Sequence, residues 1–149
     1  MKIPWITIRG SVVKGHRVAS EPSSAYPFGT LEKQIPLFKR LGLDLSRLYR
    51  ATLNISIAPS VFVVSRPEYT FEKVEWTDLH PPENFSFSQC KVRYQGSEYG
   101  GWIYYPHPET KKAHFQNPSL LEVITQKIPN IKYGDAVEVD INGDEIILI

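Results

Sequence analysis

Alternating hydrophobic and polar positions predict β-strands through most of this chain. The alternation runs from Trp5 in "WITIRGSVV" and from Ala51 in "ATLNISI". Successive side chains of a strand point to opposite faces, so each stretch has one apolar face for a core. Two strand-rich arms flank Gln95-Gly96 in "CKVRYQGSEYGGWIYY", which predicts a β-hairpin. A second hairpin is predicted in "AVEVDINGDEIILI", because Asn-Gly at 142–143 is the strongest two-residue turn signal.

Two segments carry helical signals instead. In "TLEKQIPLFKRLG", Gly42 suits a helix end, but Pro36 lacks an amide, which predicts a break near Ile35. In "NPSLLEVITQK", Pro118 suits a first helical turn, and apolar residues follow at i, i+1 and i+4 from Leu120. We therefore expect a second, short helix in this segment.

These elements favour a mainly β fold with two short helices. Many short strands within 149 residues are typical of a small β-barrel. No linker-like stretch divides the chain, so we expect a single domain over residues 1–149. No period of about twenty to fifty residues recurs, and we do not expect a solenoid or a propeller.

Composition and charge narrow the possible partners. Seventeen Lys and Arg against sixteen Asp and Glu leave a net charge of +1, so no whole-molecule field draws the protein to nucleic acid or to an anionic membrane. Cys90 is the single cysteine, which excludes an internal disulfide and fits a reducing compartment. No apolar run approaches the roughly twenty residues that cross a bilayer. We expect a cytoplasmic, soluble protein.

Thr52 and Asn54 are polar residues that alternate with Leu53, Ile55 and Ile57 in the strand "ATLNISI". Side chains two apart on a strand point to the same face, so a hydroxyl and an amide oxygen lie within reach of one cation. Neutral oxygens of this kind suit Mg²⁺, which then needs substrate phosphates to complete its shell. The alternative is that both are polar side chains on the outer face of an edge strand, without a ligand.

Six short motifs follow one another in a set order. They are "RGSVVKG" at 9–15, "LFKRLGLDL" at 37–45, "TLN" at 52–54, "YQGSEYGGWIYYP" at 94–106, "LLEVI" at 120–124 and "KYGDAVEVDI" at 132–141. In this order, over residues of about 8 to 142, the chain resembles the archaeal CTP-dependent riboflavin kinases. The resemblance implies a closed six-stranded cradle-loop barrel of the RIFT-related kind. It also implies transfer of a phosphoryl group from CTP to the 5′-hydroxyl of riboflavin, which gives FMN.

The resemblance assigns roles to individual residues. Thr52 and Asn54 of "TLN" inherit the Mg²⁺ site of the family. Glu122 in "LLEVI" matches an acidic position and is the candidate catalytic residue, a carboxylate that orients the riboflavin hydroxyl or accepts its proton. The alternative for Glu122 is a solvated residue on the surface of a short helix.

The predicted nucleotide-binding residues lie on a loop and at Arg50. Where the family has a glycine-rich loop, this chain reads "GHRVASEPSSAYPFG" and keeps Gly15 at the front. His16 and Arg17 offer side-chain charge in place of backbone amides, or are ordinary exposed loop residues. Arg50 stands where the family has the proline before "TLN". An inward Arg50 would bind phosphate or repel the metal ion.

Aromatic residues are dense in "EYGGWIYYP". Tyr99, Trp102 and Tyr104 are the candidate flavin-binding residues, because flat side chains suit an isoalloxazine ring. The alternative is that they are half-exposed strand residues and core, since aromatic residues are common in strands.

The sequence supports two classes of function. The first is a riboflavin-kinase-like phosphotransferase that uses Mg²⁺ and a nucleoside triphosphate, with riboflavin and nucleotide as its small-molecule partners. The second is a non-catalytic module on the same barrel that binds a flavin, a nucleotide or another protein, because a fold alone does not determine function. We place the kinase first, because Thr52 and Asn54 then have a reason to occur together around Leu53.

Overall fold

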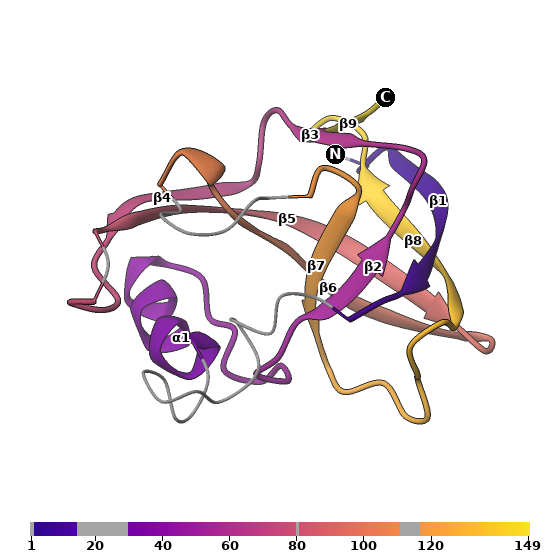
Figure 1. The fold of residues 1–149 in the computed structure, drawn as a ribbon, viewed down its shortest axis with the longest axis horizontal. Coiled ribbons are helices and arrows are strands. Elements are labelled where there is room, and N and C mark those ends of the chain that lie inside the picture. The colour runs from indigo at the N-terminus through magenta and orange to yellow at the C-terminus, as the bar shows by residue number, and fades with distance from the viewer. Residues whose placement is uncertain (1, 15–29, 80, 111–116) are drawn as a thin grey trace.

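The computed structural model describes residues 2–14, 30–79, 81–110 and 117–149. Within these ranges the chain is mainly β, with one α-helix, α1 (Thr30–Leu41), and one 3-10 turn, Pro108–Thr110 (Figure 1). The strands are β1 (Trp5–Val12), β2 (Leu53–Ser56), β3 (Phe62–Val64), β4 (Tyr69–Val74), β5 (Glu83–Tyr94), β6 (Ser97–Pro106), β7 (Leu120–Thr125), β8 (Ala136–Asn142) and β9 (Ile146–Leu148).

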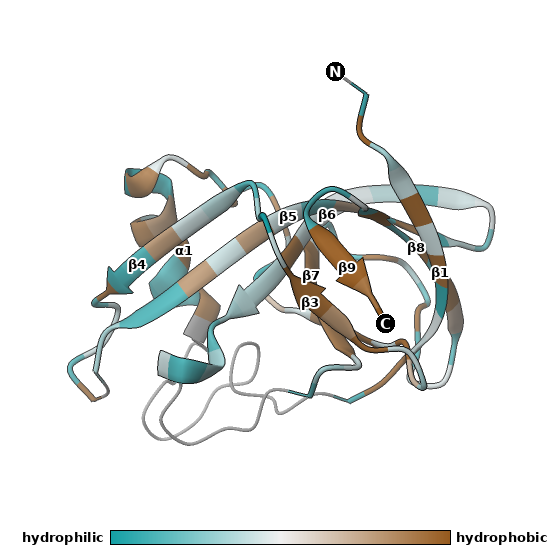
Figure 2. Cartoon of the chain, turned by 90° about the horizontal axis from the view of Figure 1, so that it is seen from above, coloured by the Kyte–Doolittle hydropathy of each residue, from teal (hydrophilic) through white to brown (hydrophobic). Residues whose placement is uncertain are grey.

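Six of the strands close into an antiparallel β-barrel, which confirms the predicted barrel. Their order is β5-β6-β7-β2-β1-β8, and β8 returns to pair with β5 from Cys90 opposite Ile141 to Arg93 opposite Glu138. β4 extends the sheet beyond the barrel by pairing with the first part of β5. β3 and β9 form a separate, largely apolar two-stranded sheet over one end (Figure 2).

Two hydrophobic cores lie on opposite faces of the sheet. The barrel core fills the interior and includes Ile55 and Val92. The helix core lies outside the barrel, where α1 packs against β4 to β7, and includes Phe38 and Phe87. β5 serves both cores because its alternate side chains point to opposite faces, Phe87 outward and Val92 inward.

Helix α1 runs unbroken through Pro36, so the predicted break near Ile35 is wrong. A proline inside a helix costs about 3 kcal/mol. Leu31, Ile35 and Phe38 are each at most 3% exposed in the helix core, and burying one such side chain contributes about 1.5–3 kcal/mol. The packing of this stripe therefore outweighs the proline.

The helix end at Gly42 and the hairpin at Gln95-Gly96 are confirmed. Gly42 has a φ of 118°, and the Leu43 N–H donates to the Phe38 carbonyl at 2.9 Å, as in a Schellman motif. Gln95 and Gly96 both have positive φ between the paired strands β5 and β6.

The segment predicted as a helix after Pro118 is the strand β7 instead. It pairs with β6 on one edge and with β2 on the other. Both of its faces are covered, with Leu121 and Val123 in the barrel core and Ile124 in the helix core. A strand buried on both faces reads as a continuous apolar run, which periodicity alone does not separate from a helix.

The hairpin predicted at Asn142-Gly143 is wrong as a strand pairing. The chain does turn there, with the Glu145 N–H donating to the Asn142 carbonyl at 3.0 Å. However, β8 already has β1 on one edge and β5 on the other. No edge is left for β9, which pairs with β3.

Candidate functional site

Thr52 and Asn54 lie side by side on the outer face of the barrel, at the start of β2. The Thr52 hydroxyl donates to Asn54 Oδ1 at 3.2 Å, so the two side chains share a face, as their spacing predicts. Ile55, the next residue, points into the barrel core and is fully buried. Two neutral oxygens therefore stand close enough to contact one cation. Each also has the other as a partner when no cation is bound.

Glu122 is the cross-strand neighbour of Asn54. The register of β2 and β7 sets Asn54 opposite Glu122 and Ile55 opposite Leu121. Side chains opposite each other in an antiparallel ladder point to the same face, with Cβ atoms about 4.5–5.5 Å apart. The Glu122 carboxylate therefore lies on the same face of the sheet as the Thr52 hydroxyl and the Asn54 amide. Each of the three side chains offers an oxygen atom as a metal ligand. Mg²⁺ prefers oxygen ligands, so these residues fit that ion.

The same face continues on β6 with Trp102 and Tyr104. Trp102 lies opposite Ile124 of β7, so Tyr104, two residues on, falls in the row of Glu122. Tyr104 is buried, and its hydroxyl donates to Gln34 Oε1 of α1 at 2.7 Å. Burial raises the pKa of the Tyr104 phenol well above its ordinary value, and the charge of Glu122 raises it further. The phenol therefore stays protonated and joins the helix to the sheet.

The three predicted flavin-binding residues do not share one face. Trp102 and Tyr104 face the helix core, whereas Tyr99 packs against the barrel core on the other side of the sheet. Trp102 is half-buried, and its ring meets that of Tyr69 edge-on with centroids 5.7 Å apart. The three therefore do not form a single aromatic wall, because odd and even positions of β6 point in opposite directions. Flavin binding by each stays a prediction.

A groove of about 480 Å³ begins at Thr52. It is lined by Tyr49 and residues 51–53, before and within β2, and by residues 125–131, at and after the end of β7. Its lining is mainly apolar and includes Leu53 and Ile128. At its side, the Lys127 ammonium lies over the ring of Tyr49, 5.5 Å from the centroid. Periodicity gave no signal for this groove, because segments far apart in the sequence form it.

Arg50 extends toward α1. Its Nη1 lies 2.6 Å from Oε2 of Glu32, in the first turn of the helix. The two side chains are 51% and 35% exposed. The Glu32 carboxylate balances the guanidinium charge, which counters the predicted repulsion of a metal ion at Thr52. Binding of nucleotide by Arg50 stays a prediction.

Gly15, His16 and Arg17 lie outside the described residues, so their predicted role in nucleotide binding stays a prediction. Val13, in the described part of the chain, lies beside the oxygen cluster formed by Thr52, Asn54 and Glu122, because its N–H donates to the Asn54 carbonyl at 2.9 Å.

A second polar cluster, which the sequence pattern did not indicate, joins β4, β5 and the end of β6. Ser86 Oγ lies 2.6 Å from His107 Nε2, and His107 Nδ1 lies 2.9 Å from Glu109 Oε2. The order of hydroxyl, imidazole and carboxylate is that of acyl-transfer enzymes. However, Ser86 is 1% exposed and its Oγ also contacts Thr70 Oγ1 at 2.9 Å. We assign this cluster a structural role, because a substrate does not reach a buried hydroxyl.

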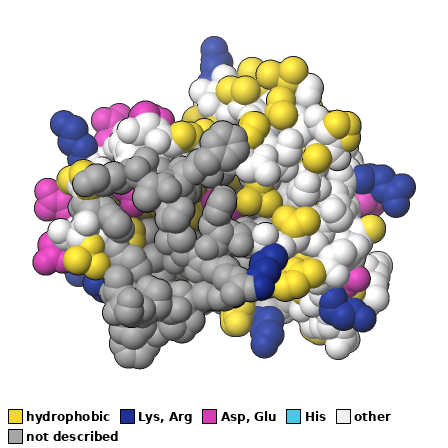
Figure 3. All heavy atoms as spheres, in the orientation of Figure 1, with side chains coloured by type: hydrophobic (Ala, Val, Ile, Leu, Met, Phe, Trp, Pro, Cys, Tyr) yellow, Lys and Arg dark blue, Asp and Glu magenta, His cyan; other side chains and the backbone are white. Residues whose placement is uncertain are grey.

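The wider surface adds no other site of this kind in the described part of the chain. Among the described residues, no three His, Cys, Asp or Glu side chains gather around a possible metal position. No helix in those ranges has the length and apolar character that a bilayer crossing requires. On the face in Figure 3, the Lys and Arg side chains that are described stand apart and do not form a continuous stripe. No protein-family model and no curated protein sequence matches this chain.

Proposed function

We propose that this protein is a riboflavin-kinase-like phosphotransferase on a cradle-loop barrel, with Mg²⁺ as its cofactor. The donor is a nucleoside triphosphate, CTP in the family that the chain resembles, and the acceptor is riboflavin. The supporting observation is that Glu122 stands opposite Asn54, whose Oδ1 lies 3.2 Å from the Thr52 hydroxyl. The motif order singled out these three residues, although Glu122 was expected on a helix. Their meeting on one face is therefore support that the sequence prediction did not contain.

The oxygen donors divide the work of phosphoryl transfer. Thr52 and Asn54 would hold Mg²⁺, which when bound neutralises phosphate charge and aligns the transferred group. Glu122 orients the 5′-hydroxyl of riboflavin and accepts its proton. A bond forms between the riboflavin 5′-oxygen and the γ-phosphorus of the donor, and the bond from that phosphorus to the β–γ bridging oxygen breaks. The products are FMN and a nucleoside diphosphate.

The groove beside Thr52 supports a planar ligand. Its volume of about 480 Å³ lies within the range of small-molecule sites, roughly 300–1,000 Å³. Tyr49 offers a ring for stacking, and Lys127 offers a cation for a phosphate group. A nucleotide or a flavin in the groove would reach the oxygen cluster through Thr52, which belongs to both.

The test is to incubate the purified protein with riboflavin, Mg²⁺ and, separately, CTP, ATP, GTP or UTP, and to measure FMN by chromatography. We expect FMN with at least one donor and none after the divalent ion is chelated. Absence of FMN with every donor would overturn the proposal.

A second candidate function is a non-catalytic flavin- or nucleotide-binding module. The observation in its favour is that Thr52 and Asn54 hydrogen bond to each other and Arg50 pairs with Glu32, so these polar groups have partners without a ligand. Calorimetry with riboflavin, FMN, CTP and CDP distinguishes the two. Binding of one of these ligands without FMN formation supports the non-catalytic module. If none of them binds, the remaining version of this candidate is a module that binds another protein.

A further inference from the structure

The segment that leads into the oxygen cluster, residues 49–52, lies outside the strand ladder. β2 begins only at Leu53. The backbone is held on one side by the Tyr49 N–H, which donates to the Thr125 carbonyl at 3.0 Å. On the other side, the Arg50 guanidinium contacts the Glu32 carboxylate of α1. The position of the Thr52 hydroxyl depends on these contacts, because only Ala51 separates Thr52 from Tyr49 and Arg50, the two held residues.

We propose that the Arg50–Glu32 ion pair is a tether that positions Thr52 for the cation, and that Arg50 is a positioning residue rather than a phosphate ligand. The inference rests on the proposed function, because it assigns regulation of cation affinity to the same site. The proposal explains why the charge of Arg50 is directed toward α1 and balanced by Glu32, although Arg50 stands two residues before the candidate metal ligand Thr52.

The helix end of the tether, Glu32, lies on a well-packed helix. Glu32 stands between Leu31, which is fully buried in the helix core, and the buried residues Gln34 and Ile35. Gln34 accepts the hydrogen bond of the Tyr104 hydroxyl, which joins α1 to β6. The strand end of the tether lies before Leu53, the first residue of β2. Because α1 is held by its buried face and residues 49–52 lie before the first residue of β2, loss of the contact should change the position of Thr52 more than that of α1.

Mn²⁺ is the probe, because its binding is measured by electron paramagnetic resonance without turnover. The variants are Arg50→Ala, Glu32→Gln and the two combined. We expect each single variant to weaken Mn²⁺ binding by about two- to fivefold, the size that an exposed ion pair supports. The double variant is expected to bind no more weakly than either single one. The exchanged pair, Glu32→Arg with Arg50→Glu, restores affinity.

The signs of the two single effects separate the tether from its alternatives. If the charges act only through space, Arg50→Ala tightens Mn²⁺ binding and Glu32→Gln weakens it. If Arg50 is a phosphate ligand that Glu32 competes for, Glu32→Gln tightens the binding of inorganic tripolyphosphate and Arg50→Ala weakens it. Either pattern overturns the tether, and so does Mn²⁺ affinity that neither substitution changes.

The matched control is Asp44→Asn, which removes the exposed Lys39–Asp44 pair, 4.0 Å apart, at the other end of α1. It should leave Mn²⁺ affinity unchanged, and thermal unfolding checks that every variant folds. Thr52→Ala identifies the site that is measured. If it leaves Mn²⁺ binding intact, the metal site of the proposed function is refuted and the tether with it. If it abolishes binding while the Arg50 and Glu32 variants have no effect, only the tether is refuted.

Discussion

Asn54 and Glu122 face each other across the ladder between β2 and β7. The pairing places a carboxylate beside the amide that already accepts the Thr52 hydroxyl. It exists because residues 120–125 form a strand between β2 and β6, with Leu121 and Val123 turned inward. Glu122, between these two residues, is therefore turned to the outer face, where Thr52 and Asn54 lie.

Substitutions at this pair should affect catalysis more than folding. Because Glu122 accepts a proton in the proposed reaction, Glu122→Gln should lower kcat for FMN formation by about 10²–10⁴-fold. Asn54→Ala should raise the Mg²⁺ concentration needed for half-maximal rate, since it removes one oxygen ligand. Steady-state kinetics with varied Mg²⁺ measures both. Ser56→Ala changes the next residue on the same face of β2, opposite Leu120, and should leave both parameters unchanged.

The Tyr104 hydroxyl should stabilise the packing of α1 on the sheet. Gln34 is 2% and Tyr104 is 3% exposed, so Tyr104→Phe leaves the Gln34 oxygen without its buried donor. We expect the free energy of unfolding to fall by about 1–3 kcal/mol, as measured by urea denaturation. Gln34→Leu in the same background should recover part of the loss. Tyr133→Phe, at a residue that is 66% exposed, should change stability by less than about 0.5 kcal/mol. Equal effects of the two Tyr→Phe changes would contradict the prediction.

Gly101 is required by the close approach of β7. A Cβ atom there would lie 2.4 Å from the Ile124 carbonyl oxygen and 2.9 Å from Thr125 Cβ. Gly101→Ala should therefore lower the free energy of unfolding by about 1–3 kcal/mol. Gly100 meets nothing within 4 Å of an added Cβ, so Gly100→Ala is the matched control and should be close to neutral. Similar denaturation midpoints for the two variants would refute this reading of the glycine pair.

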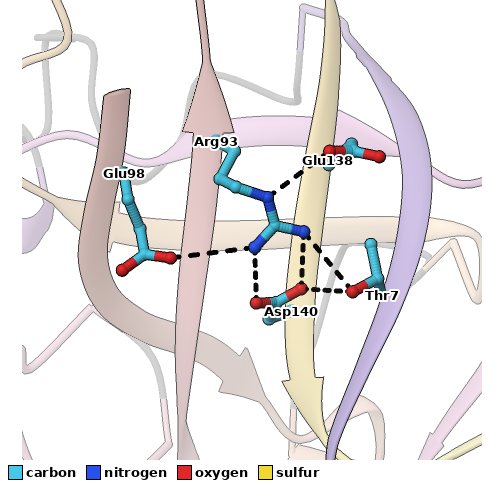
Figure 4. A network of polar contacts seen from close by, with 5 residues as sticks. All are labelled: Thr7, Arg93, Glu98, Glu138 and Asp140. Carbon is cyan, nitrogen blue, oxygen red and sulfur yellow. Dashed lines mark hydrogen bonds and ion pairs between the residues drawn. The ribbon is translucent and has the colours of Figure 1, made fainter. Parts of the chain in front are cut away.

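Asp140 stabilises the seam where β5 and β8 close the barrel (Figure 4). Both terminal nitrogens of Arg93 donate to its carboxylate, and Thr7 Oγ1 donates to Asp140 Oδ1 at 2.6 Å. The hydrogen bonds from Arg93 hold the pKa of Asp140 below its ordinary value, and that from Thr7 lowers it further. The ionised carboxylate therefore stabilises the folded state.

The contribution of Asp140 to stability should depend on pH. Because its folded pKa lies below the unfolded value of about 3.9, the contribution is fully present above that pH and is lost as pH falls through the folded pKa. Asp140→Asn should cost about 1–3 kcal/mol at pH 7, and the difference from wild type should narrow below about pH 4. Guanidinium denaturation at pH 7 and pH 3 measures this. Glu98→Gln, at a 52% exposed side chain 3.8 Å from Arg93, should have little effect. A cost of Asp140→Asn that is the same at both pH values would contradict the account.

The sequence by itself determined the features that depend on a few neighbouring residues. The two-residue period of a strand placed Thr52 and Asn54 on one face, and the hydrogen bond between them agrees. Gln95-Gly96 indicated the turn between β5 and β6, and both residues have the positive φ that a type I′ hairpin turn needs. These signals arise from backbone geometry that does not depend on the rest of the fold.

Only the tertiary structure decided which strand edges were free and which faces were covered. β9 pairs with β3 because β1 and β5 occupy both edges of β8. Residues 120–125 are a strand because two cores cover their faces and two strands cover their edges. The place of Glu122 beside Asn54 and the contact of Arg50 with Glu32 follow from these long-range pairings. The physical reason is that edge pairing and burial are shared among distant segments, whereas the local pattern specifies only each segment's own faces.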